Sequence, residues 1–193
     1  MIRRFKLFLI AALLLPTALL SGCLCLSLHP LYSGKDVVFD PALLGNWTVA
    51  NTQVYWSITR AGQNHYRMVY VDEDHKQGEF VARLVSVQGT MFLDLFPTET
   101  KSLPGNSFYA GHFLPVHSLF QVIRTKPTPQ LAVLSEEWLR KFRARHPSAI
   151  RYEEVNGNIY LTGSPREMQR FLVAHLKTKG AFALGTPWRR KLQ

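Results

Sequence analysis

Cysteine is nearly absent from this chain of 193 residues, which contains only Cys23 and Cys25. Two cysteines so close together cannot cross-link distant segments, so the sequence excludes a disulfide framework as the source of stability. An apolar core must therefore hold the fold alone. The 171 residues that follow position 22 are enough for one domain with a buried core.

Recognised catalytic motifs are also missing. The sequence has no Gly-x-Ser-x-Gly segment, no glycine-rich phosphate loop and no His-Glu-x-x-His pattern. His112 and His117 are five positions apart with Pro115 between them, and this pair alone does not predict a zinc site. We interpret both as surface or loop histidines. The sequence therefore predicts a protein that is not an enzyme and that holds no metal or other cofactor.

One apolar run, from Leu7 to Leu20, follows the basic residues Arg3, Arg4 and Lys6. The run is too short to cross a bilayer comfortably, and a short apolar run behind basic residues is typical of a signal peptide. We interpret residues 1–22 as this removable segment.

The apolar run ends in Leu20-Ser21-Gly22-Cys23, which resembles the lipobox of bacterial lipoproteins. The resemblance implies that Cys23 becomes the first mature residue and carries a diacylglycerol thioether and an added acyl chain. By the same resemblance, Leu24 in place of aspartate implies an anchor in the outer membrane, facing the periplasm. An ordinary signal peptide or a membrane helix is the alternative. We expect Cys25 to be a bystander near the membrane.

Positive charge is concentrated in the last third of the chain. Residues 135–193 contain twelve Lys or Arg and five Glu, a net charge of +7. Phospholipid headgroups, an anionic glycolipid or an acidic protein would complement this charge. The alternative is that the basic residues keep two surface helices soluble. Nucleic acid is disfavoured as a partner, because an envelope-anchored protein does not normally meet it.

The residues after Pro41 predict a mainly β fold. Short runs rich in Val, Ile, Phe, Tyr and Trp recur between turn residues, as in an antiparallel meander. Several runs are apolar on both faces, which favours a barrel covered on its outside by helices. Residues 23–40 show no sustained period, so we interpret them as a lipid-anchored tether and 41–193 as the single domain. The predicted strands span 45–50, 53–60, 65–72, 78–87, 90–96, 117–125 and 129–134.

Two helices are predicted in the last third. Ser135 can cap a helix with an acidic first turn, and Ser164-Pro165-Arg166-Glu167 forms a capping box for another. Between the helices, residues 151–154 and 159–162 flank Asn156-Gly157, which predicts a hairpin with a type I′ turn.

Leu43-Leu44-Gly45-Asn46-Trp47 resembles the first strand of lipocalins, whose Gly-x-Trp places a tryptophan across the closed end of an eight-stranded barrel. The resemblance implies a lipocalin-like barrel, although the second helix and the late hairpin depart from that family. We expect Trp47 and Trp56 to be buried and Trp138 to pack on the outside of the sheet. A longer stretch, from Ser27-Leu28-His29-Pro30-Leu31-Tyr32 to Glu137-Trp138-Leu139, resembles small uncharacterised bacterial lipoproteins and implies no activity.

Four residues are candidates for ligand binding. Tyr66, Met68 and Phe80 alternate with outward-facing positions, and small residues on the same wall predict an apolar cavity. Asp94 is the one carboxylate inside the apolar strand 91–96. In a barrel lumen it could hold a polar ligand group, and an exposed or edge position is the alternative.

Three functions follow from these observations. The leading hypothesis is a non-catalytic outer-membrane lipoprotein that binds a small apolar or amphipathic ligand in its barrel. A structural or assembly lipoprotein that docks an envelope protein is second, and a hydrolase with an unrecognised site is third. A lined cavity favours the first, a filled barrel with an exposed apolar patch the second, and convergent polar residues in a cleft the third.

Overall fold

The structure, a computed structural model, describes residues 26–49, 52–98 and 113–191. It is mainly β with two α-helices, as the sequence predicts. All seven predicted strands are confirmed to within two residues where the chain is described. They are β3 (Gly45–Val49), β4 (Tyr55–Arg60), β5 (Tyr66–Val71), β6 (Gln77–Val87), β7 (Thr90–Pro97), β8 (His117–Arg124) and β9 (Gln130–Leu134).

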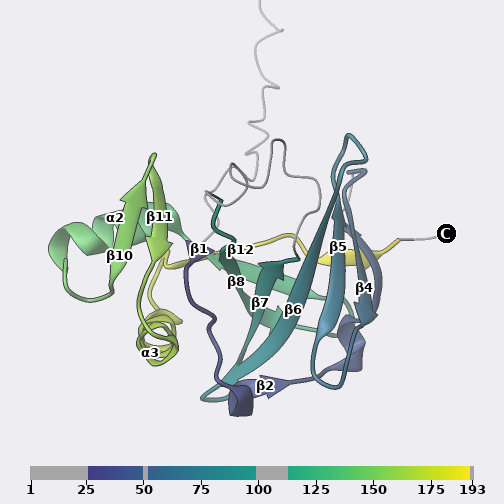
Figure 1. Ribbon diagram of the computed structural model, residues 1–193, viewed down its shortest axis with the longest axis horizontal. Helices are drawn as coiled ribbons and strands as arrows, with labels where there is room; N and C mark the ends of the chain where they lie inside the picture. Colours follow the sequence, from purple (N-terminus) through teal and green to yellow (C-terminus); the bar gives the residue numbers. More distant parts are fainter. Residues whose placement is uncertain (1–25, 50–51, 99–112, 192–193) are drawn as a thin grey trace, which may run out of the picture.

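These seven strands pair in chain order, each antiparallel to the next, and form a strongly curled sheet (Figure 1). Successive side chains of a strand point to opposite faces, so each strand contributes one set to the inside of the curl and one to the outside. β6 and β7 are the central strands, and both of their faces are apolar, as predicted.

The helices and the late hairpin lie together on one side of this sheet (Figure 1). α2 (Glu136–Arg145) begins where the Ser135 hydroxyl accepts from a backbone N–H, and α3 (Pro165–His175) begins in the predicted capping box. β10 (Tyr152–Val155) and β11 (Asn158–Leu161) form the hairpin. Asn156 and Gly157 both have positive φ, 50° and 81°, as a type I′ turn requires.

The predicted tether is wrong for residues 26–40, which belong to the fold. β1 lies between β8 and β11, and Leu31 is 0% exposed. Pieces this short leave no period in the sequence, so only their tertiary contacts reveal them. The short elements of this segment are β1 (Leu26–Ser27), η1 (Gly34–Asp36) and β2 (Val37–Val38), and η2 (Pro41–Leu43) follows directly after it.

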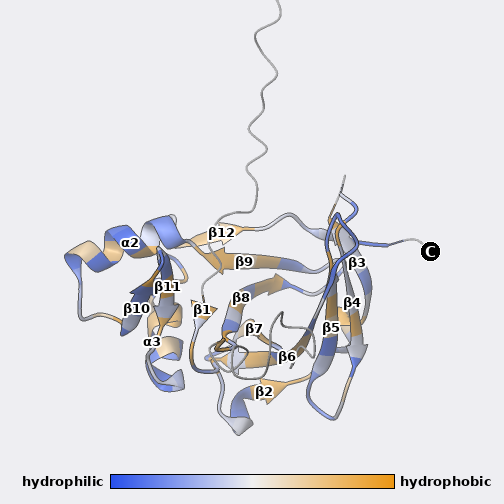
Figure 2. Ribbon diagram, turned by 45° about the horizontal axis from the view of Figure 1, so that its top comes forward, coloured by the Kyte–Doolittle hydropathy of each residue, from blue (hydrophilic) through white to orange (hydrophobic). Residues whose placement is uncertain are grey.

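The sheet separates two apolar cores, and Figure 2 shows hydrophobic residues on the strands between them. The inner core lies inside the curl and comprises Leu43, Trp47, Ile58, Tyr66, Met68, Ala82, Leu84, Leu93, Leu95, Val122, Leu131 and Trp188. The outer core lies under the helices and comprises Leu31, Val85, Val87, Phe92, Leu119, Leu134, Leu139, Ile150, Ile159, Leu161, Met168, Phe171 and Leu172. Trp47 is buried as predicted, Trp138 packs against the outer core as predicted, and Trp56 is only half-buried.

The sheet is not closed, and β10 and β13 (Trp188–Arg190) stand at the two ends of its strand order. The C-terminal segment nevertheless contacts both β3 and β9, the first and last strands of the meander. It pairs with β9 through β12 (Phe182–Leu184) and then with β3 through β13. At the start of β13, the Trp188 N–H donates to the Pro129 carbonyl at 2.9 Å.

Candidate functional site

The predicted ligand-binding residues Tyr66, Met68 and Phe80 share the inner face of the sheet. Met68 and Phe80 are direct cross-strand partners, and Tyr66 stands opposite Ala82, one inward position further along β6. The alternation in the sequence therefore identified the correct wall.

Tyr66 and Met68 are 0% and 1% exposed, so they fill the inside of the curl instead of lining an open cavity. Residues 39 and 40, directly before η2, cover the end of the inner face where Tyr66 lies. The Asp40 N–H donates to the Tyr66 hydroxyl at 2.7 Å, and Phe39 stacks on the Tyr66 ring at 4.7 Å. Burial raises the pKa of Tyr66 to about 12, so the phenol stays neutral as part of the core.

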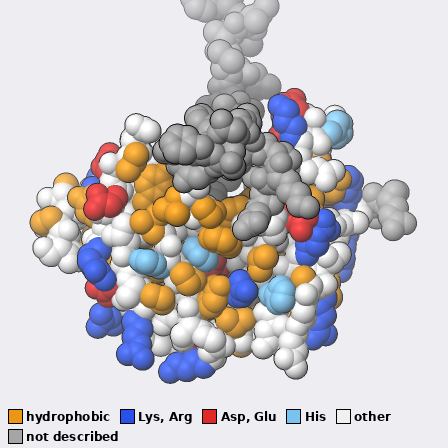
Figure 3. All heavy atoms as spheres, viewed as in Figure 1, with side chains coloured by type: hydrophobic (Ala, Val, Ile, Leu, Met, Phe, Trp, Pro, Cys, Tyr) orange, Lys and Arg blue, Asp and Glu red, His pale blue; other side chains and the backbone are white. Residues whose placement is uncertain are grey.

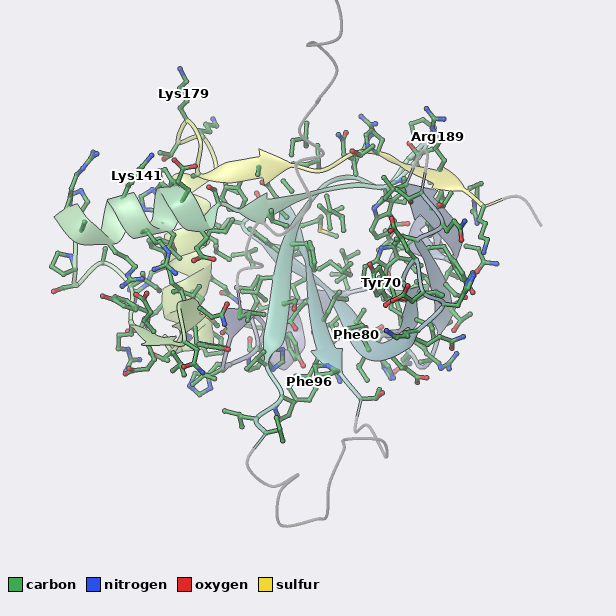
Figure 4. All side chains as sticks on the ribbon, turned by 90° about the horizontal axis from the view of Figure 1, so that it is seen from above. Tyr70, Phe80, Phe96, Lys141, Lys179 and Arg189 are labelled. Carbon is green, nitrogen blue, oxygen red and sulfur yellow. The ribbon has the colours of Figure 1, made fainter. Side chains whose placement is uncertain are left out.

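The other end of the inner face carries a group of aromatic side chains that we call the aromatic end: Trp56, Tyr70, Phe80 and Trp188. The Trp56 ring lies at its centre, with centroid distances of 4.6 Å to Tyr70, 6.3 Å to Phe80 and 6.0 Å to Trp188. Trp56, Tyr70 and Phe80 are half-buried, so part of each ring stays accessible. Figure 4 shows Tyr70 and Phe80 on the strands that form this end. Apolar rings with accessible faces are suited to contact an apolar or amphipathic ligand.

Asp94 lies on the opposite face of the sheet from the other three candidates, and the alternative of an exposed or edge position is wrong. Its strand β7 is central, and its side chain is 1% exposed. One carboxylate oxygen accepts from the Leu31 N–H at 2.8 Å, and the other lies 2.6 Å from His117 Nδ1. Asp94 therefore holds the segment before η1 on the outside of the sheet.

His117 is buried beside Asp94, so the interpretation of a surface or loop histidine is wrong for this residue. Its ring packs on Phe96 with a centroid distance of 4.5 Å. Ser27, the cross-strand partner of His117, is 0% exposed and donates to the His29 carbonyl at 2.7 Å. An aspartate at Nδ1 is the arrangement that orients a general base. Here both groups are enclosed, and the serine hydroxyl is occupied by its own backbone, so the arrangement holds chain segments together.

Sequence reasoning missed Trp188 and Tyr70 as members of a site. Tyr70 could have been found from the alternation of β5, since it stands two inward positions from Tyr66. Trp188 could not, because β13 is only three residues long and follows Pro187 near the chain end. In the described segments, no group of three His, Cys, Asp or Glu side chains is arranged to hold a metal ion.

The anchoring prediction falls on residues outside the described part of the chain, namely the lipobox, Cys23, Leu24 and Cys25, as does His112. Within residues 26–49, 52–98 and 113–191, no helix is both long and apolar enough to cross a membrane.

Compared with known proteins, the chain matches no family model, no curated protein and no solved structure.

Proposed function

We propose that this chain is an outer-membrane lipoprotein, anchored through Cys23 and facing the periplasm, that binds a small apolar or amphipathic ligand without catalysis. The lipobox-like Leu20-Ser21-Gly22-Cys23 supports the anchor. β1 begins at Leu26, three residues after Cys23. Because three residues span at most about 11 Å, the domain would lie directly against the membrane surface.

We propose further that the curled sheet acts as a lipocalin-like barrel. The path of the C-terminal segment supports this, since it bonds to β9 and then to β3, the two strands at the opening of the meander. Trp188 on this segment joins both the inner core and the aromatic end. The barrel would then be filled at the centre and accessible at one end.

The aromatic end is the observation that carries the binding function. Its half-buried rings lie above the filled part of the inner core, so a ligand would lie across them and not deep in the barrel. Covering apolar surface contributes about 25 cal/mol per Å² before the costs of association. A small acyl or aromatic group can therefore bind usefully without a deep cavity.

The second candidate is docking of an envelope protein. Leu114 and Leu184 are 71% and 63% exposed, and the centre of the curl is filled, which is the combination that favours a partner surface. The same binding experiment separates the two candidates.

The test uses residues 26–193 produced without lipid, with native mass spectrometry and a fluorescent fatty acid. We expect saturable uptake that Trp56→Ala weakens about tenfold, because the central ring of the site is lost. Trp138→Ala, which removes a half-buried tryptophan from the outer side, is the matched control and should bind as the parent does. If neither the parent nor the control takes up any probe, docking becomes the better proposal.

Anchoring has its own test with a matched pair of variants. Cys23→Ala in the full chain should abolish labelling by palmitate and leave an unprocessed precursor, whereas Cys25→Ala should be labelled normally. Equal labelling of both variants would contradict the anchor at Cys23.

A further inference from the structure

A cleft of about 770 Å³ lies outside the curled sheet, between the turn at η1, the β6–β7 turn and the start of α3. Figure 3 shows Lys and Arg side chains gathered on the lower left of the face, over α3 and η1. The lining side chains that bear charge are Lys35, Asp36, Arg166, Glu167 and Arg170.

Gln169 fixes the two walls of this cleft relative to each other. Its side-chain amide donates to the Leu31 carbonyl at 2.7 Å and to the Asp36 carboxylate at 3.0 Å. The capping box of Ser164 and Glu167 fixes the start of α3, which forms the wall opposite η1. The cleft is therefore formed by hydrogen-bonded backbone turns, which hold its shape in the absence of a ligand.

Both carboxylates of the cleft are already occupied by internal donors. Asp36 accepts from the N–H and the hydroxyl of Ser33 at 2.9 and 2.7 Å, and these bonds hold its pKa below the usual value. Glu167 accepts from the N–H and the hydroxyl of Ser164 and from Arg151, and the Ser164 hydroxyl leads the causes that lower its pKa to about 2. Neither carboxylate needs a ligand cation.

The three cations of the cleft lack the internal partners that its carboxylates have, and that three of the four basic residues of α2 also have. Arg140, Lys141 and Arg143 each form an ion pair with a glutamate. Lys35, Arg166 and Arg170 are exposed, and in the described part of the chain none of them has an ion-pair partner. Three positive side chains without an ion-pair partner therefore line one preformed cleft.

We propose that this cleft is a binding site for a phosphate-bearing anion, held by Lys35, Arg166 and Arg170. Guanidinium groups match the geometry of phosphate oxygens through paired N–H donors, and an ammonium adds a point charge. The cleft is lined by charged side chains and shares no residue with the aromatic end, so its occupant differs from an apolar ligand. The same chemistry describes free phosphate and the headgroup of an anionic phospholipid.

The test uses the full chain purified in a neutral detergent, with calorimetric titration. One arm adds inorganic phosphate, and the other compares short-chain phosphatidylglycerol with short-chain phosphatidylcholine. We expect saturable binding of phosphate, of phosphatidylglycerol or of both, and weak or no binding of the zwitterionic lipid. The arm that binds identifies the source of the anion.

Two variants assign the binding to the cleft. The double variant Arg166→Ala/Arg170→Ala should bind the anion at least about tenfold more weakly. Lys179→Ala removes an exposed cation that Figure 4 shows pointing away from the molecule, and it should bind like the parent. Circular dichroism of each variant verifies that the fold is retained. Absence of binding in both arms, or equal weakening in the double variant and in Lys179→Ala, would overturn the proposal.

Discussion

The inner and outer cores share the strands β6 to β9 but are assembled in different ways. The inner core is drawn almost wholly from consecutive strands of the meander, and the side chains at its centre are apolar. The outer core joins segments as far apart as Leu31 and Leu172, and it encloses the Asp94 carboxylate. Contacts between neighbouring strands therefore form the first core, whereas contacts between distant segments form the second.

This difference shows how the chain uses polarity. Leu93 packs in the inner core because the alternation of its strand turns its side chain inward, and an apolar side chain needs no particular partner there. At the adjacent position on the outer side, Asp94 accepts from one backbone N–H and lies against one histidine, so it selects a particular segment. A buried carboxylate left without these partners costs free energy, and this requirement makes the position of residues 26–36 specific.

The largest expected effect comes from removing the N-terminal segment. A chain that begins at Pro41, the start of the domain predicted from the sequence, loses β1 and the buried Leu31 side chain. We expect a loss of more than about 5 kcal/mol, enough to abolish cooperative unfolding. Thermal melts of residues 41–193 and 26–193 measure the difference. Equal midpoints would mean that the outer core does not need this segment.

Asp94→Ala should have the next largest effect. It leaves the Leu31 N–H without an acceptor and His117 without its partner in a buried place, and we expect a loss of about 3 kcal/mol. Urea unfolding measures it. Asp74→Ala, at an exposed turn, is the control and should change stability by less than about 0.5 kcal/mol. A loss no larger than that of the control would mean that the outer core holds without its polar contact.

Gly45→Ala tests β3, a strand that contributes to the inner core. Gly45 has φ +128°, and an added Cβ would lie 1.7 Å from Arg190 Nη1. The side chain of Arg190 can move, but the backbone cannot, so we expect a loss of about 1–2 kcal/mol. The same substitution in an Arg190→Ala background separates the two causes. Restoration of full stability there would assign the effect to the contact and not to φ.

The smallest effects lie at the start of α3. Ser164→Ala removes the cap and should cost about 1 kcal/mol in urea unfolding.

Because hydrogen bonds to Ser164 and Arg151 lower the Glu167 pKa from 4.5 to about 2, Glu167 stabilises the fold above pH 4.5. This contribution is lost as the pH falls through about 2. Glu167→Gln should therefore flatten the pH dependence of stability between pH 5 and 2, and an unchanged curve would contradict the assignment.

The candidate site could be predicted only in part. Alternation placed Tyr66, Met68 and Phe80 on one face, because a strand turns successive side chains to opposite sides. It could not show that Tyr66 is covered by the segment near η2, because that contact joins residues 26 positions apart. Asp94 was recognised as unusual within its strand, but alternation by itself does not say which face the distant chain will cover.

The meander, the two capped helices and the type I′ hairpin could be predicted from the sequence, because each depends on residues within a few positions of one another. The places of β1, β2, β12 and β13, which are two or three residues long, depend on tertiary contacts. Strands this short have no period of their own and exist because distant strands supply their hydrogen-bond partners. For the same reason, only the tertiary structure brings Lys35 into one cleft with Arg166 and Arg170.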